Sequence, residues 1–176
     1  SYVGLYGMNE NNIEQVVSGI NLGANLGTDV FYSGTVGAAI AGINLKYAPV
    51  AISVCSFSPR DISFIAEKAF ELIQKFRSIS LQQNSLININ FPDILKQDYK
   101  GELYTKLAKR GVPEAPNIIS KNDQLSFTFS ASGDFIDGQT DTDMQAIENG
   151  YVSVSILNYD ISNAIDFLGR EISHGS

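Results

Sequence analysis

The sequence is poor in the side chains that most often act as nucleophiles, general bases or zinc ligands. Its 176 residues include one cysteine and one histidine. A single cysteine excludes an internal disulfide and a cysteine-based zinc cluster, and no basic neighbour in sequence activates the Cys55 thiol. We therefore expect Cys55 to belong to the core. His174 lies in a polar tail two residues from the end, so a triad that needs a histidine has little support.

Positive charge is also scarce, and long apolar runs are absent. Lys and Arg number 12 against 19 Asp and Glu, which gives a net charge of −7 and a pI near 4.6. This balance argues against a nucleic acid duplex as partner, because such binding depends on clustered basic residues. No run reaches membrane-spanning length and no signal-like segment opens the chain. We expect one globular domain with no membrane partner, located in the cytoplasm.

The most informative stretch runs from Val16 to Ala39. A β-branched pair, Val16-Val17, predicts the end of a strand that begins near Ile13. A loop follows, with glycines at 19, 23 and 27 and amides at Asn21 and Asn25. Then Ser33-Gly34-Thr35 opens a helix of small residues that we expect to reach about Asn44 and to pack closely on its neighbours.

Two interpretations of this stretch stay open on the residues alone. Free backbone N–H groups at a helix N-terminus suit an anion, and an asparagine offers an oxygen to a hard cation and an NH₂ to a phosphate. The stretch would then be a phosphate site that also contacts a metal. Alternatively, glycine and asparagine serve here as turn residues that connect a strand to a well-packed helix.

The first half of the chain otherwise alternates strands and helices, which predicts an open α/β sheet. Residues 1–9 end a helix, while 49–54 and 86–91 are short apolar runs that suit buried strands. Ser58-Pro59 is typical of a helix start, and apolar residues follow at helical spacing to Phe76. Asn88 and Asn90 are interpreted as satisfying backbone groups.

The second half predicts short strands over residues 102–108, 124–131 and 150–157, with an exposed loop at 109–122. The carboxylate-rich run 134–143 fails the spacing of a calcium loop. It is better explained as a loop in which Thr142 or Asp143 caps a short helix to Asn149, followed by Gly150. A C-terminal helix is expected from about Ser162 to Ile172.

Several segments together resemble the SurE family (survival protein E). The pattern Ser-Gly-Ile-Asn, spaced Gly and Asn, and Tyr-Ser-Gly-Thr-Val stands between Val16 and Ala39. Ala51-Ile52-Ser53, residues 86–92 and residues 143–153 match in the same order. The resemblance implies a Rossmann-like, mostly parallel sheet flanked by helices, in which residues 1–92 complete the main sheet and 93–176 form a β-rich extension with an oligomerisation arm.

The resemblance also implies a function, namely a metal-dependent phosphatase of nucleoside monophosphates, a 5′/3′-nucleotidase. Asn21 would contact Mg²⁺ or Mn²⁺, while Asn25, Ser33, Gly34 and Thr35 would hold the phosphate of a small nucleotide. A homodimer or homotetramer is expected. The family's Asn-Asp-Asp-Gly segment is not found here, so we expect this chain to match the carboxyl-terminal two thirds of the family and to be inactive alone. The alternatives are a catalytically inactive nucleotide- or phosphate-binding module and a purely structural oligomerisation module.

Overall fold

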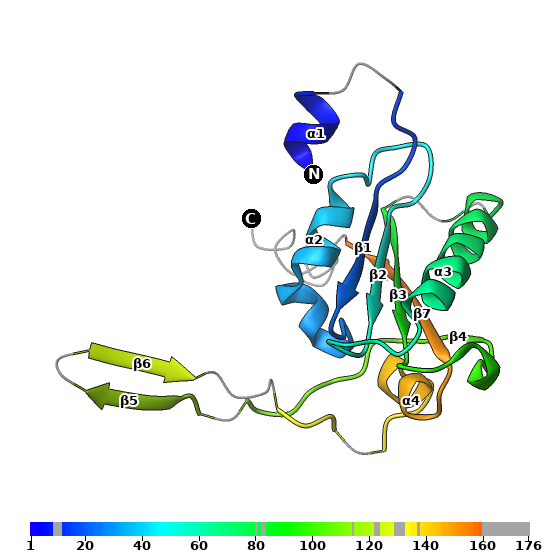
Figure 1. Cartoon of the computed structure of the whole chain (residues 1–176). Helices are drawn as coiled ribbons and strands as arrows, with labels where there is room; N and C mark the ends of the chain where they lie inside the picture. The colour runs from blue at the N-terminus through cyan, green and yellow to red at the C-terminus, as the bar shows by residue number, and fades with distance from the viewer. Residues whose placement is uncertain are drawn as a thin grey trace, which may run out of the picture.

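A twisted five-stranded sheet forms the centre of the molecule (Figure 1). The computed structural model describes residues 1–8, 12–79, 81, 84–113, 115–121, 124–128, 133–136 and 138–159. The strands lie in the order β1 (Val17–Leu22), β2 (Val50–Val54), β3 (Ser85–Phe91), β7 (Val152–Asn158) and β4 (Glu102–Tyr104). β1, β2 and β3 run parallel, β7 is antiparallel to β3, and β4 is parallel to β7. The expected mostly parallel α/β sheet is confirmed.

Helices cover the two faces of this sheet (Figure 1). α3 (Ile62–Arg77) packs on one face, where its buried side chains meet apolar side chains of β2, β3 and β7 in the larger core. α2 (Gly34–Ile40) packs on the other face, where Val36 and Ala39 contact a smaller cluster that includes Ala51 and Leu86. β2 and β3 are buried along their whole length, as their apolar runs predicted.

The start of α3 differs from the sequence expectation. Asp61, not Ser58, is the N-cap, and its Oδ1 accepts the N–H of Phe64 at 3.0 Å. Ser58 is exposed, and its own N–H donates to Ser56 Oγ at 3.2 Å. Asp and Ser are about equally good N-caps, so residue type alone does not decide between Ser58 and Asp61.

α2 is shorter than expected and is not uniformly close-packed. It ends at Ile40, and residues 41–44 continue as tighter turns with bonds from Gly42 to Ala39 and from Ile43 to Ile40. A Cβ at Gly42 would lie 2.6 Å from Val16 Cγ2, so close packing requires glycine there. A Cβ at Gly34 or Gly37 would meet nothing within 4 Å. The packing argument for small residues therefore holds at Gly42 and is wrong at Gly37.

The second half of the chain extends the main sheet, which corrects the expectation that residues 86–91 complete it. β7 and β4 both come from beyond Pro92. β4 has three residues where a longer strand was predicted. The predicted loop at 109–122 contains β5 (Asn117–Lys121), which pairs with β6 (Gln124–Thr128) in a separate hairpin that projects from the body (Figure 1).

The remaining elements are short. α1 (Tyr2–Tyr6) confirms a helix at the start of the chain, and η2 (Lys96–Asp98) is a single 3₁₀ turn. α4 (Asp143–Glu148) has the predicted N-cap, because Thr142 Oγ1 accepts the N–H of Gln145 at 3.2 Å. Gly150 follows it with φ +79°. The predicted C-terminal helix and His174 lie outside the described residues. No helix in the described part of the chain is long and apolar enough to cross a bilayer.

Candidate functional site

The predicted site residues gather at the carboxyl edge of the parallel strands. The sequence placed Ser18 to Asn21 in a loop, which is wrong, since β1 extends from Val17 to Leu22. Pairing with β2 includes Ser18, is irregular at the next two residues and resumes at Asn21. A Cβ at Gly19 would lie 2.3 Å from the Ile52 carbonyl oxygen, so β2 approaches the β1 backbone closely there. Asn21 therefore sits near the end of an edge strand, and its Nδ2 donates to the Gly23 carbonyl at 2.9 Å.

A polar row crosses the sheet at this level. Strand register pairs Asn21 with Ser53, Ser53 with Asn90, and Asn90 with Ser153. Because register partners share a face, these four side chains lie on the α2 side of β1, β2, β3 and β7. Ser53, Asn90 and Ser153 are fully buried. The opposite face of the same strands is apolar. On the α2 side the sheet is polar at the level of this row and apolar around Ala51 and Leu86.

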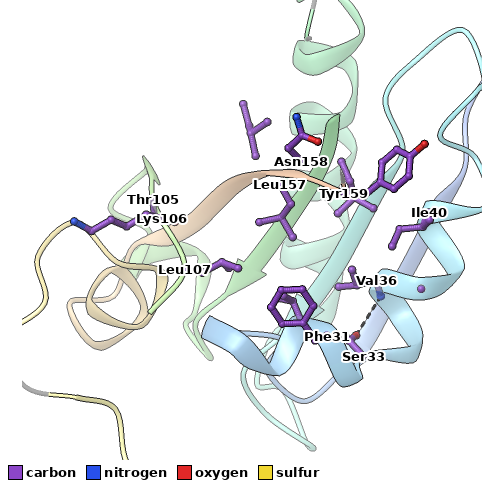
Figure 2. A pocket seen from close by; sticks show the side chains of 14 residues that line it. Phe31, Ser33, Val36, Ile40, Thr105, Lys106, Leu107, Leu157, Asn158 and Tyr159 are labelled. Carbon is purple, nitrogen blue, oxygen red and sulfur yellow. Dashed lines mark hydrogen bonds between the residues drawn. The ribbon is translucent and has the colours of Figure 1, made fainter. Parts of the chain in front are cut away.

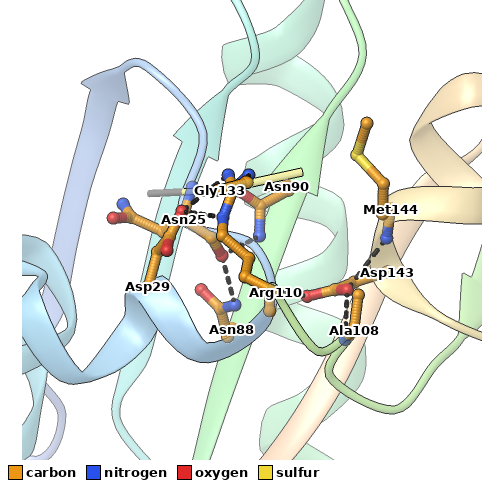
Figure 3. A network of polar contacts seen from close by, with 10 residues as sticks. Asn25, Asp29, Asn88, Asn90, Ala108, Arg110, Gly133, Asp143 and Met144 are labelled. Atoms are coloured by element: carbon orange, nitrogen blue, oxygen red, sulfur yellow. Dashed lines mark hydrogen bonds and ion pairs between the residues drawn. The ribbon is translucent and has the colours of Figure 1, made fainter. Parts of the chain in front are cut away.

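Asn25 ties the loop after β1 to this row (Figure 3). Its backbone N–H donates to Asn90 Oδ1 at 2.9 Å, and its carbonyl accepts Nδ2 of both Asn88 and Asn90 at 2.9 Å. Its own Nδ2 donates to Ser53 Oγ at 2.6 Å. The interpretation that Asn88 and Asn90 satisfy backbone groups is confirmed, although both lie on a central strand. Asn88 Oδ1 has no hydrogen-bond partner among the described residues.

The Asn25 residue is 7% exposed and forms hydrogen bonds with three neighbouring side chains. Its assignment to a phosphate stays a prediction, and the structure adds a second role, namely fixing the loop. Sequence reasoning recognised the amides of residues 25, 88 and 90 separately. It did not join them, because residues 63 and 65 positions apart meet only when the sheet is assembled.

The loop then turns through η1 (Gly27–Tyr32) into α2. Ser33 is the N-cap of α2, and its Oγ accepts the N–H of Val36 at 3.1 Å. The amides of Gly34 and Thr35 are in the first turn, where no intrahelical acceptor exists. α2 runs antiparallel to β1, so Asn21 and the start of α2 lie at the same edge of the sheet (Figure 1).

Asp143 is a further component of this region. It ends the loop 134–143, for which the family resemblance implies a supporting role near the substrate cleft, but its contacts were not predicted. Its carboxylate is fully buried and accepts N–H groups of Gly27 at 2.7 Å, Ala108 at 2.8 Å and Met144 at 2.8 Å (Figure 3). Burial raises the pKa of this carboxyl, while the three donors oppose that rise. The residue was predicted as a possible helix cap, and nothing in sequence links it to Gly27.

Arg110 supports the same loop from the side (Figure 3). Its Nε and guanidinium NH₂ bind Asp29 Oδ2 at 2.8 and 2.7 Å, and a further N–H donates to the Gly133 carbonyl at 2.8 Å. The guanidinium also lies 3.9 Å from the ring centre of Phe135. Both ends of the ion pair are about four-fifths buried, so it joins η1 to the base of the hairpin.

A cavity of about 480 Å³ opens beside the site, between α2 and β7 (Figure 2). Ser33 contributes to its wall, and the rest is mostly apolar, from Val36 and Ile40 on α2 to Leu86 and Leu157 on the sheet. Lys106 adds a cationic side chain. Of the predicted site residues, the cavity includes Ser33 and no other.

The donor set for a metal is incomplete in the described part of the chain. No three His, Cys, Asp or Glu side chains gather there closely enough to hold an ion. Burial, aided by the Asp143 charge, raises the pKa of the Cys55 thiol to about 12, which disfavours the thiolate. Cys55 is half-buried at the end of β2 and lies outside both core clusters, so its expected place in the core is met only in part. Asn21 offers one neutral oxygen, which by itself does not bind a hard cation.

Comparisons with known proteins place this geometry in a wider context. Residues 1–114 match the family described as Survival protein SurE. The chain is 36% identical over 160 residues to the 5′-nucleotidase SurE of Pseudomonas savastanoi pv. phaseolicola, covering 90% of this chain and 64% of that protein. The 5′-nucleotidase SurE of Ruthia magnifica is 36% identical over 171 residues, covering 96% of this chain and 69% of that protein.

The fold is similar to a solved structure as well. A crystal structure of the SurE protein from Aquifex aeolicus superposes with a TM-score of 0.72 at 28% identity, covering 95% of this chain and 70% of that one. The chain spans 64% of the length of the Pseudomonas relative.

Proposed function

The chain belongs to the SurE family, and on that basis we propose that it is part of a metal-dependent phosphatase that hydrolyses nucleoside 5′- or 3′-monophosphates. The observation that carries the proposal is the 36% identity to proteins named 5′-nucleotidase SurE over 90% of this chain. The shared carboxyl edge of Asn21, Asn25 and Ser33 supports it, because open α/β sheets bind ligands at that edge.

A divalent cation fits this chain only in part. Asn21 supplies one neutral oxygen, and no group of three His, Cys, Asp or Glu side chains among the described residues completes a ligand set. We propose Mg²⁺ or Mn²⁺, with Asn21 as one contributor. Such an ion supplies Lewis-acid polarisation of a phosphoryl oxygen and a more acidic water. We therefore propose that the 176-residue chain alone binds metal weakly and is inactive.

The residues of the chain itself bind and orient the phosphate in this proposal. Ser33 presents its hydroxyl, and the amides of Gly34 and Thr35 donate to phosphate oxygens at the positive end of α2. Asn25 contributes from the loop, where its contacts to Ser53 and Asn90 fix its position. A preorganised set of donors of this kind stabilises the charge of a phosphoryl group without rearrangement.

Binding of phosphate by the chain tests the proposal. We expect inorganic phosphate and a nucleoside monophosphate to compete for one site in isothermal titration calorimetry. Ser33→Ala removes a donor to an anion, so it should weaken binding about tenfold. Thr28→Ala, an exposed hydroxyl of η1, is the control and should change nothing. No binding by the wild-type chain contradicts the proposal. Phosphate release with Mn²⁺ that Asn21→Ala abolishes would show instead that the chain has a complete metal site.

A second candidate is a phosphate- or nucleotide-binding module without catalysis. The lack of a metal-ligand cluster among the described residues favours it. Nucleotide binding that chelators leave unchanged, in the longest form of the protein obtained from its source, would select this alternative over the enzyme.

We further propose that the protein is a homodimer or homotetramer assembled through the β5–β6 hairpin. Register places Ile118, Phe127 and Leu125 on one face of the hairpin, and all three are more than half exposed. An isolated two-stranded hairpin is at best marginally stable, so an apolar face of this kind calls for cover.

A further inference from the structure

Asp143 is an unusual side chain for the interior of this sheet. It is 0% exposed, and in the described part of the chain it forms no ion pair. Its three partners are backbone N–H groups, two of them far away in sequence, 116 and 35 residues distant. A buried carboxylate costs free energy unless its surroundings compensate it, and here the compensation comes from the segments that it joins.

The first of these segments carries the proposed phosphate site. Gly27 donates to Asp143 Oδ2 at 2.7 Å and is the first residue of η1, which leads directly to Ser33. Two residues before Gly27, the Asn25 backbone is held by Asn90. The Gly27 backbone is tightly packed. A Cβ at this position would lie 2.6 Å from the Ala108 carbonyl oxygen and 3.0 Å from the Phe135 ring.

The second segment is the support against which Gly27 rests. The N–H of Ala108 donates to Asp143 Oδ1 at 2.8 Å, so the two oxygens of one carboxylate hold Gly27 and Ala108 side by side. Two residues further along, Arg110 binds Asp29. The loop is therefore linked to the segment 108–110 at two points. One link is the buried Asp143 carboxylate, which binds both Gly27 and Ala108, and the other is the ion pair of Arg110 with Asp29.

We infer that Asp143 is a positioning residue for the proposed phosphate site. It acts through the Gly27 amide, which sets the position of η1 and with it the placement of Asn25 and Ser33. This role deepens the proposed function and rests on it. Asp143 does not touch the phosphate and carries no step of the chemistry.

The test compares Asp143→Asn with Thr142→Ala in the 176-residue chain. The Asn variant keeps the shape but turns an NH₂ toward the donor of Gly27 or Ala108. Thr142→Ala removes the neighbouring N-cap of α4 and leaves the link to Gly27 in place. We expect the Kd for inorganic phosphate to rise about tenfold in Asp143→Asn and to stay within about twofold in Thr142→Ala. Equal Kd values in the two variants would overturn the inference, since a purely structural role of α4 predicts that result.

Hydrogen exchange separates this inference from the proposed function. If the wild-type chain binds no phosphate, the proposed function fails, and exchange across residues 23–33 still decides the role of Asp143. Faster exchange there in Asp143→Asn than in Thr142→Ala supports it, and equal rates refute it. If Asp143→Asn does not fold, the hydrogen-exchange rate of the Gly27 amide in the wild-type chain provides the test. We expect this amide to be protected from exchange about as well as the amides of β3. An unprotected Gly27 amide refutes the role of Asp143.

Discussion

Asn90 forms hydrogen bonds with both backbone groups of a single residue, Asn25. Its Oδ1 accepts the Asn25 N–H, and its Nδ2 donates to the Asn25 carbonyl. Asn88 provides only a second donor to that carbonyl, and its own Oδ1 is buried without a partner. The two residues therefore offer a matched pair of substitutions at equal burial.

We expect Asn90→Ala to lower the free energy of unfolding by about 3 kcal/mol, because it leaves the buried Asn25 N–H without an acceptor and opens a cavity. Asn88→Ala should cost about 1 kcal/mol, since Asn90 still serves the Asn25 carbonyl and an unpaired oxygen is removed with the side chain. Urea unfolding followed by circular dichroism measures both. Equal losses in the two variants would mean that the Asn25 contacts contribute nothing specific.

At the scale of elements, the apolar patterns of the sequence predicted the buried strands and the amphipathic helix. The strands predicted from the apolar runs at 49–54 and 86–91 and the helix predicted from apolar spacing to Phe76 are confirmed, because burial on a sheet requires those patterns. β1 was cut short at Val17, since glycine and asparagine suggest a turn, whereas pairing with β2 resumes at Asn21 after an irregularity that follows Ser18. β5 was overlooked because its pairing with β6, and not its composition, makes it a strand.

The same limit applied to the site. Asn21, Asn25 and Ser33 were predicted as site residues from the pattern of the loop and from the family resemblance, and their roles stay predictions. Asp143 and Arg110 were not, because their partners Gly27 and Asp29 lie 116 and 81 residues away. Sequence spacing does not predict such contacts, because they form only when the second half of the chain packs against the loop.

The start of α3 offers a test of which local signal prevails. Asp61→Ala should lower the free energy of unfolding by about 1 kcal/mol, because the Phe64 amide loses its cap. Ser58→Ala, at the position that the sequence favoured, should leave it unchanged within about 0.5 kcal/mol. Thermal and urea denaturation of the two variants side by side measure the difference. A larger loss at Ser58 would restore the earlier helix start.

For the molecule as a whole, residues 1–92 and 93–176 do not separate into independent parts. β7 and β4 continue the sheet begun by β1, β2 and β3, and Asp143 and Arg110 from the second half hold the loop of the first. The hairpin is the exception, since β5 and β6 pair with each other and project away from the sheet (Figure 1). Assembly through the hairpin would thus leave the core and the site loop intact.

The hairpin carries its own control for that assembly. Ile118 faces Phe127 on the apolar side, whereas Ile119 pairs with Ser126 on the opposite side and is similarly exposed, at 53% against 57% for Ile118. We expect Phe127→Lys to shift the protein toward the monomer, raising the dissociation constant at least about tenfold, because burying an aromatic side chain stabilises an interface by roughly 1.5–3 kcal/mol. Ile119→Lys adds the same charge to the other face and should leave the assembly state as it is. Sedimentation equilibrium of the wild type and both variants measures this. A wild-type monomer, or equal dissociation by the two variants, would contradict assembly through the Ile118–Phe127 face.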